Sequence, residues 1–149
     1  MGFKRFNYFV LLVVIGSVLP GAVWAKGNIA IDVKTVLASQ ESEYLDPRLS
    51  SLTKELQSIF RYSSYRLLSE DHVGLTMKET GTASLPGNRV LKITPMQVVE
   101  GRIELKLVIL KKKKEIFQTI IKLLNHRSLT VGGPKHQDGV LLFNISASF

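Results

Sequence analysis

Apolar and polar residues alternate along most of the chain after Ser63. The clearest stretch is 102–110, where every second side chain is apolar and Glu104 and Lys106 lie between them. A period of two predicts a β-strand with one buried face. The same pattern predicts strands at residues 29–37, 65–68, 73–78, 89–99, 102–110, 115–124, 128–131 and 140–149. The segments 65–68 and 73–78 are expected to form one strand, or a bent pair interrupted at Glu70-Asp71.

Turn-forming residues separate these strands. Pro86 and Gly87 suit the central positions of a β-turn, and Glu100-Gly101 and residues 111–114 are further tight connections. Proline donates no ladder hydrogen bond, so the strand around Pro95 is expected to be bulged or to lie at an edge. Strands about ten residues apart with turns between them indicate a sandwich or a partly closed barrel.

One amphipathic helix is predicted over residues 47–60. Asp46 can accept the free backbone N–H groups at its start, and Pro47 suits the first helical position. Five apolar residues then recur at helical spacing: Leu49, Leu52, Leu56, Ile59 and Phe60. The fold class is therefore α+β, a mainly antiparallel sheet or sandwich with one helix packed on it.

The first 25 residues have the pattern of a secretory signal peptide. Lys4 and Arg5 precede the apolar run 9–19, and Val23-Trp24-Ala25 places small residues before a cut at Lys26. Residues 1–25 are thus predicted to be removed, leaving one β-rich domain over 26–149. The alternative is an uncleaved anchor, since the stretch from Phe6 to Ala25 approaches the ~20 residues of a spanning helix.

The composition supports an exported protein that depends on its own hydrophobic core. The chain has no cysteine, which excludes a lipid-modified cysteine and a disulfide scaffold, and suits a bacterial periplasm or cell surface. Its formal charge of +8 falls to +6 without the leader, because residues 1–25 contain two basic residues and no acidic one. Such a charge favours contact with anionic lipid or acidic glycans.

Several segments together resemble small exported bacterial proteins of unassigned function. They are the leader, Asp46-Pro47-Arg48-Leu49, Tyr65-Arg66-Leu67-Leu68, Leu85-Pro86-Gly87 and Val131-Gly132-Gly133-Pro134 followed by Asp138-Gly139. The resemblance covers most of residues 26–149. Its motifs are turns and packing signals, so it implies no activity.

The most unusual feature is a run of four lysines at a predicted hairpin tip: Lys111, Lys112, Lys113 and Lys114. Such a tip is a candidate contact for anionic lipid or glycan. The alternative is a solvated turn whose charges keep two apolar strands from aggregating. Nucleic acid is not expected as a partner, because no aromatic residues that could stack on bases are interleaved with the lysines.

No motif predicts a reaction, a cofactor, a metal site or a small-molecule ligand. The segment 132–139 lacks the spacing and the helix of a phosphate-binding loop, and is interpreted as a tight turn. Two ligands, His136 and Asp138, are too few for a metal. Glu70-Asp71-His72 is a carboxylate–imidazole cluster without a recognisable nucleophile. A periplasmic hydrolase with an unrecognised site remains an alternative.

The last strand and the outward side chains suggest how the protein acts. Residues 140–149 alternate and end on Phe149, as does the closing strand of outer-membrane β-barrels, so a small barrel-like protein is a further alternative. Four apolar residues are expected on the strand face opposite the core: Val108, Leu110, Ile116 and Ile120. Either the helix or a second sheet covers them, or they form a surface for a partner. The favoured function is a non-enzymatic binding or structural accessory protein of the bacterial cell envelope, docking on an anionic surface or on a partner's strand edge.

Overall fold

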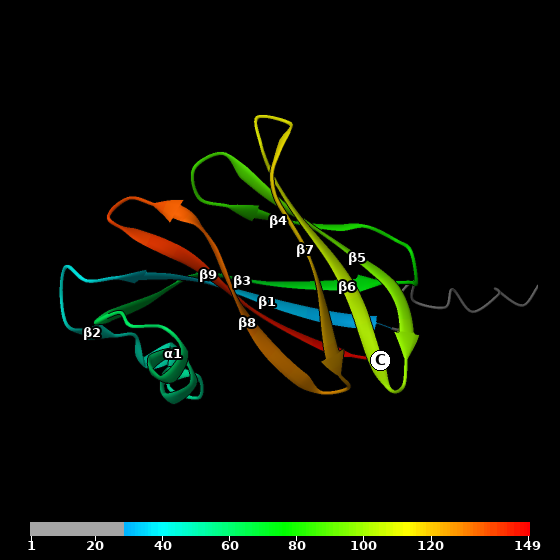
Figure 1. Cartoon of the computed structure of the whole chain (residues 1–149), viewed down its shortest axis with the longest axis horizontal. Coiled ribbons are helices and arrows are strands. Elements are labelled where there is room, and N and C mark those ends of the chain that lie inside the picture. Colours follow the sequence, from blue (N-terminus) through cyan, green and yellow to red (C-terminus); the bar gives the residue numbers. More distant parts are fainter. Residues whose placement is uncertain (1–28) are drawn as a thin grey trace, which may run out of the picture.

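A computed structural model describes residues 29–149, which form nine strands, one 3₁₀ turn and one short α-helix (Figure 1). The predicted signal peptide lies outside the described residues. The strands are β1 (Ile29–Ser39), β2 (Tyr44–Leu45), β3 (Ser64–Leu75), β4 (Gly81–Leu85), β5 (Arg89–Val99), β6 (Arg102–Lys111), β7 (Lys114–Leu124), β8 (Arg127–His136) and β9 (Gly139–Ser148). The helical elements are η1 (Pro47–Leu49) and α1 (Thr53–Ile59).

The strands form two sheets that pack face to face as a sandwich. A five-stranded sheet has the order β2-β3-β1-β9-β8, and a four-stranded sheet has the order β4-β5-β6-β7. Every pairing is antiparallel except the short parallel contact of β2 with β3. The β-rich α+β class is therefore confirmed.

The alternating apolar residues fill the space between the two sheets. On β6 the four predicted core residues are at most 1% exposed: Ile103, Leu105, Leu107 and Ile109. They pack against Ile31 and Val33 of β1 and against Phe143 and Ile145 of β9. Burial of this shared face is the main source of stability, at about 25 cal/mol per Å² of apolar surface.

A second, smaller core lies on the outer face of the five-stranded sheet. There α1 and η1 cover one end of that face, away from the four-stranded sheet (Figure 1). Its buried residues come from the helical segment and from β1, β3 and β9: Leu49, Leu52, Leu56, Val36, Ala38, Tyr65, Leu67 and Leu142. The helix therefore leaves the other end of the same face open.

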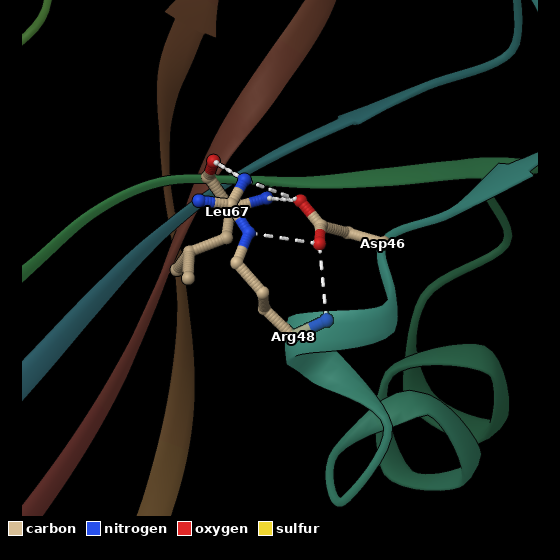
Figure 2. A network of polar contacts seen from close by, with 3 residues as sticks. All are labelled: Asp46, Arg48 and Leu67. Atoms are coloured by element: carbon tan, nitrogen blue, oxygen red, sulfur yellow. Dashed lines mark hydrogen bonds and ion pairs between the residues drawn. The ribbon is translucent and has the colours of Figure 1, made fainter.

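Asp46 fixes the start of the helical segment to the edge of β3 (Figure 2). Its Oδ1 accepts hydrogen bonds from the backbone N and the Nε of Arg48, both at 3.0 Å. Its Oδ2 accepts from Arg48 Nη2 at 2.8 Å and from the backbone N of Leu67 at 3.1 Å. Arg48 Nη2 also donates to the Leu67 carbonyl at 3.1 Å. The side chains of Asp46 and Arg48 thus form hydrogen bonds with the backbone N–H and the carbonyl of Leu67. They take the place of a neighbouring strand there, because β2 ends before it reaches Leu67. The predicted cap at Asp46 is confirmed.

The predicted helix is shorter than expected. A 3₁₀ turn over Pro47–Leu49 and a turn at Ser50-Ser51 precede α1, which ends at Ile59. Serines compete for backbone hydrogen bonds and favour such turns over a continuous helix. Leu52 and Leu56 are nevertheless buried as predicted, whereas Ile59 is 56% exposed.

Two strand predictions are settled or corrected by the structure. Of the two alternatives for residues 65–78, the single strand is confirmed and the bent pair is wrong, because β3 continues through Glu70 and Asp71, paired with Lys34 and Val33 of β1. A bulge at Leu68 supplies the only register shift in this pairing. β8 continues past residue 131 through the glycines to His136, with an irregularity between Gly132 and Lys135. The expected loop at 132–139 is therefore reduced to a two-residue turn at 137–138.

The remaining strand predictions fit the structure closely. β5 has the predicted bounds and carries the expected bulge after Pro95, although it lies inside its sheet and not at an edge. The short strand β4 was not predicted, because its five residues mix threonine, serine and glycine with two apolar side chains.

Candidate docking surface

The lysine run forms the predicted hairpin turn. Lys111 ends β6 and pairs with Lys114 at the start of β7. Lys112 and Lys113 occupy the two turn positions with φ of 50° and 64°. All four residues are exposed, and the turn projects beyond the neighbouring strands (Figure 1). The four ammonium groups are therefore displayed together at one end of the four-stranded sheet.

The backbone of this turn is unfavourable for lysine. Two consecutive residues with positive φ define the two-residue hairpin turn in which Asn-Gly is preferred. Residues with a Cβ pay roughly 1–2 kcal/mol each for this left-handed conformation. Folding alone therefore does not explain why lysine occupies both turn positions.

The turn continues into a face of mixed apolar and basic character, here called the basic face. It lies on the outer side of the four-stranded sheet and is defined by Val90, Lys92, Lys106, Val108, Leu110, Gln118 and Ile120. Glu104 and Lys122 lie farther along the same side, and Ile116, also expected opposite the core, is 43% exposed. The strand register sets Lys92 beside Val108, and Lys106 beside Ile120. Val90 is 36% and Ile120 is 55% exposed, so these side chains meet solvent. The helix cannot cover them, because it packs on the other sheet.

Apart from Glu115, which is exposed and pairs with Leu110 at the base of the lysine hairpin, the free charges of the basic face are positive. Within residues 29–149, neither Lys92 nor Lys106 has an ion-pair partner. Lys122 differs, because its Nζ lies 3.2 Å from Glu104 Oε1. Hydrogen bonds from Gln97 and from Lys122 lower the pKa of Glu104, which therefore stays ionised and neutralises Lys122. An anionic surface meeting this face encounters apolar contacts and unpaired ammonium groups together.

The predicted carboxylate–imidazole cluster is divided by the sheet. Asp71 pairs with the core residue Val33 and approaches Ser69, whereas Glu70 and His72 lie on the opposite, outer face. The ring of His72 contacts the carboxylate of Asp32, a strand away. Hydrogen bonding to Asp32 and its charge raise the pKa of His72.

His136 and Asp138 are not brought together as a site. Asp138 lies close to Glu41, and a hydrogen bond with Asp138 raises the pKa of Glu41. His136 ends β8 at the other side of the turn, near Gly87. Residues 29–149 contain no group of three or more histidine, cysteine, aspartate or glutamate side chains arranged to hold a metal ion.

Sequence reasoning found the lysine tip but missed Lys92, Lys106 and Val90. Each alternates with a core residue, which places it on the outer side of its strand. Their grouping depends on strand register, and register is set by pairing partners elsewhere in the chain. No signal in the sequence indicated that the helix would pack on the other sheet.

Comparison with protein-family models, with curated proteins and with solved structures finds no match to this chain. Within the described residues, no helix has the length and apolar character needed to cross a membrane.

Proposed function

We propose that this protein is an exported, non-enzymatic accessory protein of the bacterial cell envelope that docks on anionic lipid. Docking uses the basic face together with Lys111–Lys114. Export is inferred from the leader pattern of residues 1–25. The observation that supports docking is the uncovered sheet face on which exposed apolar side chains alternate with unpaired lysines.

The physical chemistry of this face suits a lipid headgroup layer. Each lysine held near an anionic leaflet contributes about 1 kcal/mol, and the effect decays within a Debye length. Six lysines lie on or beside the face, namely Lys92, Lys106 and the four of the hairpin. Ile120 and Val90 supply apolar surface between them. An acidic soluble protein could pair with the lysines, but it would also need apolar pockets that fit the exposed apolar side chains of this face.

The hairpin provides the sharpest test, because Asn and Gly favour its turn conformation whereas lysines favour its binding to anionic lipid. In a Lys112→Asn/Lys113→Gly variant, the turn gains its preferred residues and the free energy of unfolding rises by about 1 kcal/mol. The same variant loses two charges at the tip, so binding to anionic vesicles weakens roughly 30-fold. Cosedimentation of the purified chain without its predicted leader (residues 26–149) with phosphatidylcholine vesicles, with and without phosphatidylglycerol, measures the binding.

The matched control removes two charges elsewhere. Lys54 on α1 and Arg61 just after it are exposed and lie outside the basic face. A Lys54→Ser/Arg61→Ser variant should weaken vesicle binding less than about threefold, since its changes lie away from the lipid. An Ile120→Ser variant should weaken binding without any change in charge. Equal losses in the two double variants, or binding that does not depend on phosphatidylglycerol, would show that docking does not use this face.

A further inference from the structure

The open end of the five-stranded sheet carries a polar hollow of about 270 Å³. It lies on the outer face, beside the residues that lead into α1, and opposite the sandwich core. Its lining comes from β1, β3, β8, β9, the turn before β8 and the segment before α1: Asp32, Lys34, Ser51, Leu52, Glu70, His126, Arg127, Ser128, Asn144 and Ser146. None of these residues belongs to the basic face.

Strand register arranges the polar side chains in two rows. The first row runs across four adjacent strands through His72, Asp32, Ser146 and Ser128. The second row runs parallel to it through Glu70, Lys34, Asn144 and Thr130. Neighbouring strands lie about 4.8 Å apart, so hydrogen-bonding groups follow one another at close intervals.

The second row is tied to the helix by hydrogen bonds. Asn144 is only 5% exposed, and its Nδ2 donates to Thr130 Oγ1 at 3.0 Å. Thr130 Oγ1 in turn donates to Glu55 Oε1 of α1 at 3.1 Å. In the first row, Ser146 Oγ lies 3.5 Å from Asp32 Oδ2. These contacts fix the floor of the hollow before any ligand arrives.

The charges within the hollow are balanced. Lys34 Nζ lies 3.9 Å from Glu70 Oε1, and Asp32 contacts His72. A small anion would face both carboxylates, and a cation would face Lys34 and Arg127. A neutral ligand rich in hydroxyl groups meets no such repulsion, because each hydroxyl both donates and accepts a hydrogen bond. Carboxylate and amide oxygens can accept from it, while ammonium, guanidinium and serine groups can donate.

From this arrangement we infer that the hollow is a binding site for a neutral oligosaccharide, held by the two polar rows of the five-stranded sheet. The inference does not depend on lipid docking. The hollow is lined by no tryptophan, tyrosine or phenylalanine on which a sugar ring could stack. Binding is therefore expected to be modest, with a Kd of about 1 mM.

The test is a titration of the purified, ¹⁵N-labelled full chain with two neutral probes, maltotetraose and chitotetraose, followed by amide chemical shifts. We expect saturable shifts at Lys34, Glu70, Asn144 and Ser146 with at least one probe, and none on the basic face. Absence of saturable shifts with both probes would refute the site. So would tighter binding of a sulfated oligosaccharide at the same four amides.

The variant that probes the hydrogen bonds is Asp32→Asn/Glu70→Gln. Both carboxylates are partly solvated, at 49% and 42% side-chain exposure, and the substituted amides keep their shape, so the fold should tolerate the change. Affinity for the neutral probe should fall about tenfold, as two charged acceptors become neutral. Glu115→Gln, an exposed carboxylate at the base of the lysine hairpin, is the matched control and should leave affinity unchanged. If the double variant loses its dispersed amide spectrum, Glu70→Gln alone provides the same comparison. Unchanged affinity in a folded variant would refute the proposed rows.

Discussion

At the scale of single residues, Asp46 joins the helical segment to the sheet. Its carboxylate is 2% exposed and accepts four hydrogen bonds, three from Arg48 and one from Leu67. The hydrogen bonds from the Arg48 side chain are the main cause of a pKa well below the ordinary 3.8, although burial opposes them. The ionised form is therefore bound more tightly in the folded state than in the unfolded chain.

An Asp46→Asn variant should lower the melting temperature by roughly 5 °C at neutral pH, because it keeps the shape and loses the charge. The sign of the pH dependence follows from the lowered pKa. The stabilisation is complete above the ordinary carboxyl pKa and is lost as the pH falls toward the folded-state value. Thermal unfolding at a series of pH values should therefore show the two proteins converging in acid. Glu43→Gln, a neighbouring exposed carboxylate, is the control; a constant difference at every pH would contradict this role.

At the scale of elements, the β8–β9 hairpin depends on close backbone approach at Gly139. A Cβ added there would lie 2.2 Å from the Ala38 carbonyl oxygen of β1. β9 is the inner strand that pairs with both β1 and β8, so this crowding cannot be relieved by moving a free edge. The glycine is required by space, not by a left-handed φ.

Gly139→Ala should lower the free energy of unfolding by about 1–3 kcal/mol through overpacking. Gly132→Ala is the matched control in the same hairpin, because its nearest contact, to Phe60, would be an ordinary 3.8 Å. Urea unfolding of both variants measures the difference. Equal stability of the two variants would mean that β9 can shift away from β1.

At the scale of the whole molecule, the sandwich core couples the two sheets. Leu105 is fully buried in the four-stranded sheet and packs in the shared core, whereas Tyr65 is buried under α1 on the far side of the other sheet. The two residues therefore lie in separate clusters, one between the sheets and one under the helix. If the molecule unfolds cooperatively, a substitution at Leu105 also shifts the unfolding transition measured at the helix-covered cluster.

Leu105→Ala should lower the free energy of unfolding by about 2–5 kcal/mol, the usual loss for such a cavity. Urea transitions followed by tyrosine fluorescence and by far-ultraviolet circular dichroism should shift together. A shift in circular dichroism alone would show that the sheet and the helix-covered cluster unfold independently.

The strand pattern made much of the fold predictable. Period-two alternation located β5, β6, β7 and β9 within a residue or two, and correctly assigned the buried side of β6. It failed where charged or turn-forming residues lie inside a strand, as at Glu70 in β3 and Gly132 in β8. There the hydrogen bonds of a neighbouring strand override local preference.

The candidate sites were predictable only in part. The lysine tip is a contiguous run and was visible in the sequence, whereas the rest of the basic face and the polar hollow bring together strands distant in the chain. By itself the sequence determined which side chains avoid water and which positions turn the chain, because those properties belong to each residue and its near neighbours. Tertiary structure alone decided which sheet the helix covers, and therefore which outer faces stay exposed. The reason is that the burial of a face depends on contacts between segments that are far apart in the sequence and meet only in the folded chain.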